Sequence, residues 1–228
     1  MRTAKSYWLL ALVAGVLLAA PVAASAMTMA DLLQGGSIIV GDKEIYGFHN
    51  YNSIGDQPVD PSTIGVQPEM FGTELGVKFQ SASFYVGPNQ MQDTCFDFFV
   101  RIIPMTGANW LISDNTLRMT GAGRGTGRAS IIETVRTEDE MQSLANKLVI
   151  VSQLFNQTVD HKVFKDVNGV LTPVPAIHVS KDIGLVGGAD GVAGISDFGQ
   201  TFSQVPEPAT LSFLVIGGIG ALLGRKRR

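Results

Sequence analysis

Apolar and polar residues alternate through much of the stretch between residues 27 and 205, and this pattern restricts the fold more than any other feature of the chain. The side chains of a β-strand point alternately to the two faces of a sheet, so a strand with one buried face shows a period of two. In the clearest run, one face carries Phe96, Phe98, Val100 and Ile102, and the other carries Cys95, Asp97, Phe99 and Arg101. Residues 95–102 are therefore predicted to form a strand with one face in a core.

The same pattern recurs in nine further short segments. The other predicted strands cover residues 37–40, 44–48, 75–79, 84–86, 110–119, 129–135, 147–155, 177–185 and 192–202. Turn-forming pairs such as Gly41-Asp42 and Asn168-Gly169 separate them. Many short strands at this spacing predict an all-β fold, an antiparallel β-sandwich or jelly roll.

Helix signals are few. Residues 29–34 are predicted to form one short helical turn. Thr137 is followed three residues later by Glu140, which is the spacing of a capping box, so a brief helix is expected from 137 through Asn146. Residues 199–205 are interpreted as a tether between the β-rich body and the end of the chain.

The body is acidic once the two ends of the chain are set aside. The whole chain carries 17 Lys and Arg against 20 Asp and Glu. Two of the cations precede residue 27, four follow residue 224, and Glu207 lies near the end, which leaves 11 basic and 19 acidic residues in between. This net charge of −8 disfavours nucleic acid and anionic lipid as partners of the body.

The chain has a single cysteine, Cys95. One thiol cannot form an intramolecular disulfide, so a hydrophobic core must hold the body together. About 180 residues are enough for one such domain. Cys95 itself is expected to be a half-buried strand residue.

The first 26 residues have the three parts of a secretory signal peptide. Arg2 and Lys5 give a positive start, residues 8–20 are apolar, and Ala24-Ser25-Ala26 has the small-residue pattern that signal peptidase cleaves. Cleavage is expected after Ala26, with Ala24 and Ala26 as the recognised residues. The mature chain would then begin at Met27, outside the cytoplasm.

The last 24 residues contain three successive parts with different physical properties. Pro206-Glu207-Pro208 is followed by an uncharged apolar stretch, residues 209–224, and then by the cations Arg225, Lys226, Arg227 and Arg228. As a helix rising about 1.5 Å per residue, the apolar stretch would span roughly 24 Å of membrane lipid. The four cations favour the cytoplasmic side, so the body would lie outside.

This order of motif, apolar stretch and basic end resembles the sorting tail of PEP-CTERM proteins, a class of bacterial envelope and exported proteins. The resemblance implies that an exosortase, a membrane protease-transpeptidase, reads the tail and processes the chain near Pro206, Glu207 and Pro208. It covers about a tenth of the chain and implies no activity for the body. The domain organisation that follows is a signal peptide at 1–26, an exported β-sandwich domain at 27–204 and a sorting tail at 205–228.

Patterns that would indicate catalysis or transition-metal binding are weak. His49, His161 and His178 lack the i, i+4 and H-E-x-x-H spacings of zinc sites, so each is expected on a loop or a strand surface. No G-x-S-x-G motif is present. The glycine-rich segment 121–128 lacks the lysine of a phosphate-binding loop and is interpreted as a hairpin connection.

Two carboxylate pairs are the candidates for a glycosidase on this fold. They are Asp93 with Asp97, and Glu138 with Glu140; nothing in the sequence separates them from ordinary solvated acids.

Two kinds of ligand have candidate residues. Asp190, within the glycine-rich segment 187–191, and Asp197 are weak candidates for a structural Ca²⁺ site, and no other cofactor is expected. Tyr46, Phe48, Tyr51 and Trp110 are the aromatic residues on which a sugar ring would stack, although the alternation places Tyr46 and Phe48 on one face, as core residues would be.

The sequence therefore predicts a non-enzymatic cell-surface or extracellular-matrix protein, sorted through its tail. The implied partners are signal peptidase, exosortase, membrane lipid and exopolysaccharide, and the implied roles are in envelope or biofilm structure. A carbohydrate-binding module and a secreted polysaccharide-active hydrolase are the alternatives.

Overall fold

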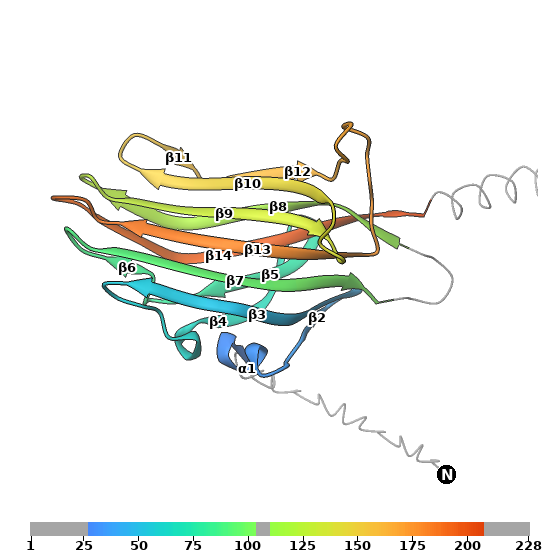
Figure 1. Cartoon of the computed structure of the whole chain (residues 1–228), viewed down its shortest axis with the longest axis horizontal. Helices are drawn as coiled ribbons and strands as arrows, with labels where there is room; N and C mark the ends of the chain where they lie inside the picture. Colours follow the sequence, from blue (N-terminus) through green and yellow to red (C-terminus); the bar gives the residue numbers. More distant parts are fainter. Residues whose placement is uncertain (1–26, 104–109, 208–228) are drawn as a thin grey trace, which may run out of the picture.

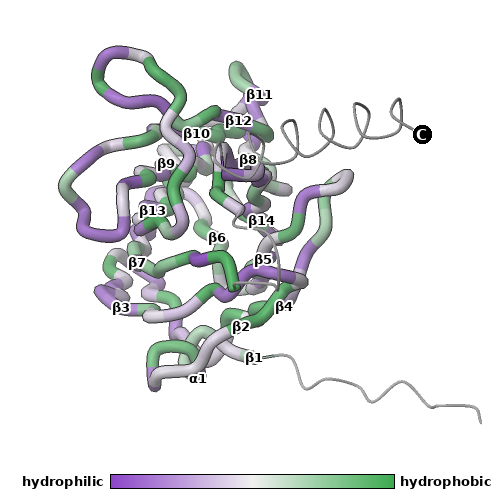
Figure 2. The backbone as a smooth tube through the Cα atoms, turned by 90° about the vertical axis from the view of Figure 1, so that its right-hand side faces the viewer, coloured by the Kyte–Doolittle hydropathy of each residue, from purple (hydrophilic) through white to green (hydrophobic). Residues whose placement is uncertain are grey.

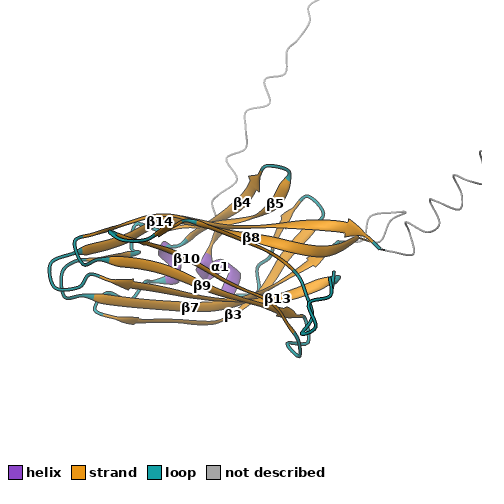
Figure 3. Cartoon of the chain, turned by 90° about the horizontal axis from the view of Figure 1, so that it is seen from above, coloured by secondary structure: helices purple, strands orange, loops and turns teal. Residues whose placement is uncertain are grey.

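Two antiparallel seven-stranded sheets lie face to face in the computed structural model, which describes residues 27–103 and 110–207 (Figure 1). In the first sheet the order is β1 (Met27–Thr28), β4 (Gly65–Phe71), β5 (Glu74–Gln80), β14 (Val192–Pro206), β8 (Trp110–Arg124) and β12 (Val159–Val163), with β6 (Tyr85–Val86) also paired to β14. In the second it is β11 (Asn156–Gln157), β10 (Ser143–Ser152), β9 (Arg128–Thr137), β13 (Ala176–Val186), β7 (Met91–Ile102), β3 (Lys43–Gly55) and β2 (Ile38–Val40). The view from above separates the two layers (Figure 3).

The all-β sandwich predicted from the alternation is confirmed. Each of the ten predicted segments overlaps a strand, and most of these strands are longer than predicted. Buried and more exposed residues alternate along strands such as β7 and β9, and Figure 2 shows hydrophobic and hydrophilic segments along the backbone as seen from one end of the sandwich. Glycine-rich residues 121–128 do connect two strands, since β8 runs to Arg124 and β9 begins at Arg128.

Four strands were missed. β1 and β11 have two residues each, too few for a periodic pattern, and β4 and β12 lack the alternation. β4 contains Pro68 and buries only Val66, which is consistent with a position beside the two-residue strand β1. β12 lies at the edge of the first sheet and has no buried residue. Strands with little buried surface give little periodic signal.

The short helix near residue 29 is confirmed, but the one expected from Thr137 is wrong. Helix α1 (Met29–Leu33) begins with a capping box formed by Thr28 and Asp31. After Thr137 the chain instead makes a tight turn from β9 into β10, in which Glu140 has a positive φ of 62° and the Thr137 hydroxyl donates to Asp139. The β9–β10 hairpin therefore overrides the local helix signal. The second short helix, η1 (Pro61–Thr63), is of the 3-10 type.

Phenylalanines from both sheets form the centre of the core. The rings of Phe79 and Phe198, from the first sheet, have centroids 5.0 Å apart, and Phe79 meets Phe96 of the second sheet at 5.2 Å. Phe48 stacks on Phe98 at 5.2 Å. All five rings are buried, so the two inner faces interlock through aromatic contacts.

Two bulges in β3 change which of its residues face the core. Gly47 and Asn50 have positive φ values of 62° and 53°, and each marks an extra residue in the pairing of β3 with β7. The first bulge places Tyr46 on the outer face while Phe48 enters the core, so the expectation that these two share a face is wrong.

The last strand continues to the edge of the described chain. β14 runs through residues 199–205, and Gly199, Gln200, Thr201 and Phe202 are buried, so this segment is part of the sheet and the expected tether is wrong. Within residues 27–103 and 110–207, no helix is long and apolar enough to span a membrane. The expected membrane segment, 209–224, lies outside these ranges.

Candidate functional site

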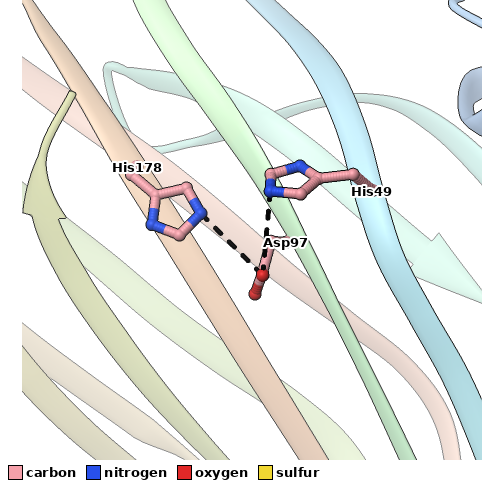
Figure 4. Close-up of side chains that lie close together, drawn as sticks. All are labelled: His49, Asp97 and His178. Atoms are coloured by element: carbon pink, nitrogen blue, oxygen red, sulfur yellow. Dashed lines mark ion pairs between the residues drawn. The ribbon is translucent and has the colours of Figure 1, made fainter. Parts of the chain in front are cut away.

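Two histidines and an aspartate from three neighbouring strands meet on the outer face of the second sheet (Figure 4). His49 comes from β3, Asp97 from β7 and His178 from β13. His49 is paired directly with Asp97 across β3 and β7, and His178 lies one strand further on, opposite Phe99. Period-two alternation turns Asp97 outward, because its neighbours Phe96 and Phe98 are core residues.

A single carboxylate oxygen is the centre of this His49–Asp97–His178 cluster. Asp97 Oδ2 lies 3.9 Å from Nε2 of His49 and 3.9 Å from Nε2 of His178. The same oxygen accepts a hydrogen bond of 2.6 Å from the Asn50 side-chain amide. His49 Nδ1 lies 2.7 Å from the carbonyl oxygen of Gly47, to which it donates as the N–H tautomer, leaving the Nε2 lone pair directed toward Asp97.

His178 is the buried member of the cluster. Its side chain is 2% exposed, and neither ring nitrogen has a hydrogen-bond partner among the described residues. Burial lowers the pKa of His178, and this effect exceeds the opposing effects of the Glu140 and Asp97 carboxylates. The imidazole is therefore held neutral, which is the form that ligates metal ions.

The hairpin turn between β9 and β10 reaches this face. Glu140 Oε2 lies 3.9 Å from His178 Nδ1, and Glu138 accepts a hydrogen bond of 2.8 Å from the Tyr46 hydroxyl. Burial and that bond to Glu138 raise the pKa of Tyr46 to about 12. The Phe99 ring packs against Tyr46 at 5.7 Å and against His178 at 4.9 Å. The cluster thus has an aromatic floor on one side and an acidic turn beside it.

The three side chains fit a small divalent transition metal after a modest closure. The three ligand atoms lie within 4.8 Å of one another. Two ligands of a tetrahedral zinc ion, each bonded at about 2.0–2.1 Å, are about 3.4 Å apart. The two Nε2–Oδ2 distances of 3.9 Å exceed this by about 0.5 Å, and the two Nε2 atoms lie within 4.8 Å of each other, so all three side chains would have to move inward to bind one ion. Imidazole and carboxylate ligands in this ratio suit zinc or iron, with positions left for water.

A second, more exposed group lies on the outer face of the first sheet. Glu74, Asp114 and His161 also bring ligand atoms within 4.8 Å of one another. Here the Glu74 carboxylate already accepts hydrogen bonds from Thr201 (2.7 Å) and Ser203 (2.9 Å). These bonds lower the pKa of Glu74 against the effect of its burial, so hydroxyl groups already satisfy this carboxylate.

The carboxylates expected to act in pairs have separate environments. Asp93 and Asp97 are four residues apart on one strand, which at about 3.3 Å per residue places them about 13 Å apart, beyond the separations used by glycosidases. Asp93 instead interacts with Asp182 on β13, and burial together with the charge of Asp93 raises the pKa of Asp182. Glu138 contacts Tyr46, whereas Glu140 lies beside His178.

Cys95 is half-buried on the same face, as expected. Burial and the charges of Asp93, Asp182 and Asp97 raise the pKa of its thiol. A raised pKa keeps the sulfur protonated, which is the unreactive form.

The aromatic and calcium candidates do not assemble. Tyr46 lies on the second sheet and Trp110 on the first, Phe48 is in the core, and the Tyr51 hydroxyl donates to the Val59 carbonyl at 2.6 Å. For calcium, Asp190 accepts from Thr126 at 2.8 Å and Asp197 from Thr120 at 3.1 Å, so the two aspartates have different partners.

Sequence reasoning did not identify the His49–Asp97–His178 cluster. The cluster needs β3, β7 and β13 to be neighbours in the sheet, although they are far apart in the chain. In addition, the bulges at Gly47 and Asn50 change which face of the sheet His49 occupies. The one indication in the sequence was the alternation of residues 95–102, which places Asp97 on the outer face of its strand.

The processing residues lie at the edge of, or beyond, the described chain. Pro206 ends β14, where it pairs with Trp110, and Glu207 follows it. Ala24, Ala26, Pro208 and the basic residues Arg225, Lys226, Arg227 and Arg228 lie outside the described residues, so their roles stay predictions.

Comparison with known proteins identifies the tail. Residues 204–228 match the family model of the PEP-CTERM protein-sorting motif. No curated protein matches the chain in sequence.

Solved structures share the β-rich architecture only distantly. TmCBM61 in complex with β-1,4-galactotriose aligns with 68% of this chain and 89% of its own at 11% identity, with a TM-score of 0.29. A family 11 carbohydrate-binding module from Clostridium thermocellum, in complex with a β-1,3-1,4-mixed-linked tetrasaccharide, aligns with 74% of this chain and 96% of its own at 9% identity, with a TM-score of 0.27.

Proposed function

We propose that this chain, which carries a PEP-CTERM sorting motif at 204–228, is an exported cell-surface or matrix protein of non-enzymatic type. Signal peptidase removes residues 1–26, and membrane lipid holds residues 209–224 until an exosortase acts near Pro206, Glu207 and Pro208. The cations Arg225, Lys226, Arg227 and Arg228 keep the end of the chain in the cytoplasm. The folded sandwich is then the product delivered to the envelope, the exopolysaccharide or the biofilm matrix.

The position of the motif relative to the last strand carries this proposal. The sorting motif overlaps the end of β14, and the last buried residue of that strand is Phe202. Cleavage after Pro206 would therefore remove no core side chain, so the released sandwich keeps its packing. A cut a few residues earlier would remove residues paired with β8 and weaken a central strand.

Replacing Pro206, Glu207 and Pro208 together by alanine tests the sorting step. The variant should accumulate in the envelope at full tail length, whereas the parent protein should lose its tail. Pro88→Ala, which changes an exposed proline far from the tail, is the matched control and should be processed normally. Normal processing of the triple variant would contradict the proposal.

A broad glycan panel separates the structural role from its two alternatives. The proposal expects neither binding nor cleavage by the protein recovered from the envelope or the medium. Binding that disappears in Trp110→Ala or Tyr46→Ala would favour the carbohydrate-binding module. Turnover that disappears when one carboxylate becomes an amide would favour the hydrolase.

Metal binding is a second candidate function, favoured by buried His178, which lies beside Asp97 and whose two ring nitrogens have no hydrogen-bond partner within residues 27–103 and 110–207. Calorimetric titration of the protein with Zn²⁺ should show one site, and His178→Ala should abolish it. His161→Ala is the control, because His161 belongs to the separate Glu74 group. Equal binding by the His178→Ala variant and the parent would refute this assignment.

A further inference from the structure

In the core, four buried polar side chains donate hydrogen bonds to the carboxylate of a fifth, Glu133. Glu133 Oε1 accepts hydrogen bonds from Lys147 Nζ at 2.6 Å, Asn115 Nδ2 at 2.8 Å and Gln200 Nε2 at 3.0 Å. Glu133 Oε2 accepts from Lys181 Nζ. Each of the five residues is at most 3% exposed. A set of ionisable and amide groups this deep in a phenylalanine-rich core is not explained by the sorting function.

The five residues come from facing sheets. Glu133, Lys147 and Lys181 project from β9, β10 and β13 of the second sheet, whereas Asn115 and Gln200 project from β8 and β14 of the first. β10 packs against β8, so the ammonium of Lys147 and the amide of Asn115 meet between the layers. Lys147 Nζ and Asn115 Nδ2 both donate a hydrogen bond to Glu133 Oε1, at 2.6 Å and 2.8 Å. The distance between the two nitrogens therefore cannot exceed the sum of these two lengths.

The charges of the cluster do not balance. Two lysines share one carboxylate, and an unpaired charge in a dry core is strongly unfavourable. Lys181 lies 5.9 Å from the ring centroids of both Phe98 and Phe198, which partly stabilise its charge. Asp160, on β12, also favours the charged form of Lys147, but its carboxylate is 3.2 Å from Lys162 and accepts from the Leu148 backbone. The charge-balanced arrangement has one charged and one uncharged lysine. Burial lowers the pKa of both, and the ring contacts of Lys181 favour it as the charged partner of Glu133, with the uncharged nitrogen at Lys147.

We propose that Lys147 and Asn115 form an intramolecular amide bond that joins the two sheets covalently, with Glu133 as the proton-transfer group. Burial lowers the pKa of Lys147 and so increases the fraction of its nucleophilic, uncharged form. The geometry supplies the rest: the attacking nitrogen and the amide are both hydrogen-bonded to Glu133 Oε1 before reaction, which reduces the entropic cost of bringing them together.

The step balances in atoms and protons without an oxidant or a cofactor. The uncharged Lys147 nitrogen attacks Cγ of Asn115, and a C–N bond forms. Glu133 Oε1 takes one proton from Lys147 Nζ and transfers it to Asn115 Nδ2, since it is bonded to both. The Cγ–Nδ2 bond then breaks, and ammonia leaves. A reaction that occurs once in each molecule needs no rapid turnover.

Asn115 rather than Gln200 is the acceptor that the packing favours. Gln200 lies on β14, which packs toward β13 and β9 rather than β10, and its carboxamide has one more rotatable bond. Within the described part of the chain, the side-chain carbonyl oxygens of Asn115 and Gln200 are both buried without a hydrogen-bond partner, so it is the packing of β8 against β10 that favours Asn115. The product leaves Lys181 and Glu133 as a balanced ion pair in the core.

Mass spectrometry of the protein from its native source tests this directly. The intact mass should be about 17 Da below the value calculated for its observed termini, which is one ammonia lost in nucleophilic substitution by the lysine. Exhaustive tryptic digestion should yield residues 102–118 joined to residues 137–162, uncut after Lys147. An unmodified mass, a linear peptide that ends at Lys147 in full yield, an ammonia loss confined to one linear peptide, or a bond through Lys181 or Gln200 would overturn the proposal.

Two variants test the roles of the residues. Lys147→Arg and Glu133→Gln should each abolish the joined peptide, and Lys162→Arg, a change at an exposed lysine on β12, should leave it intact. The native mass decides the proposal even where a core variant fails to fold. A joined peptide that persists in a folded Glu133→Gln protein would refute the proton-transfer role.

Discussion

Glu133→Gln is expected to lower the free energy of unfolding by about 3–5 kcal/mol at neutral pH, the range for breaking a buried ion pair from one side. The substitution preserves side-chain volume but removes the charge that Lys147 and Lys181 share. The pKa of Glu133 gives a second value for this loss of stability. Despite complete burial, which opposes ionisation, the two lysines lower the pKa of Glu133 from 4.5 to about 2. At about 1.4 kcal/mol per pKa unit, this shift corresponds to roughly 3 kcal/mol.

The pH dependence has a definite sign. The folded-state pKa of Glu133 is below the unfolded value, so the stabilisation is fully present above about pH 4.5 and is lost as the pH falls toward 2. Urea unfolding of the parent and the variant at several pH values measures it. The difference should be about 3–5 kcal/mol at pH 7 and should shrink steadily between pH 5 and pH 2.

The control is Glu138→Gln at an exposed carboxylate on the same hairpin, which should change stability by less than about 0.5 kcal/mol. Both proteins in this comparison also carry Lys147→Arg, which keeps a cation at position 147 and cannot form the proposed amide bond, so the difference reports the charge effect alone. A Glu133→Gln protein within about 1 kcal/mol of the parent at pH 7 would refute the reasoning. So would a difference that stays constant from pH 5 to pH 2.

Three further predictions test the packing and the outer-face cluster. Phe198→Ala removes a fully buried ring between the sheets and should cost about 3–5 kcal/mol in urea unfolding; a cost below about 1 kcal/mol would contradict the packing. Gly47→Val forces a β-branched residue to a φ of 62° and should destabilise by roughly 1–3 kcal/mol, with weaker Zn²⁺ binding because the bulge places His49; unchanged thermal melting would contradict this. At a free Zn²⁺ concentration of 100 times Kd, stability should rise by about 2.7 kcal/mol, and an equal rise in His178→Ala would exclude this cluster.

The fold could be predicted because its core strands bury one face each. Phe96 and Phe98 alternate with Cys95 and Asp97, and this signal depends on local geometry alone. Of the four missed strands, β4 and β12 bury one residue and none, and β1 and β11 are only two residues long, so all four lack the same signal. The helix expected after Thr137 failed because hairpin pairing between β9 and β10 outweighs one capping pattern.

The two polar clusters could not be predicted, because each depends on contacts between distant strands. In the sequence, nothing distinguishes Lys147, Lys181 and Glu133 from exposed charged residues. The structure shows that all three side chains point into the core. The phase of His49 depends on the bulges at Gly47 and Asn50, and its approach to His178 depends on β7 lying between β3 and β13. Sequence periodicity contains neither the strand order nor the register.

The central claim is that an exported sandwich is cut from its tail just beyond β14. The intact mass of the protein recovered from its native envelope and medium tests it most directly. The account predicts a chain that begins at Met27 and ends within residues 206–208, beyond the last buried residue, Phe202. A chain that retains Arg228 in both fractions would contradict it.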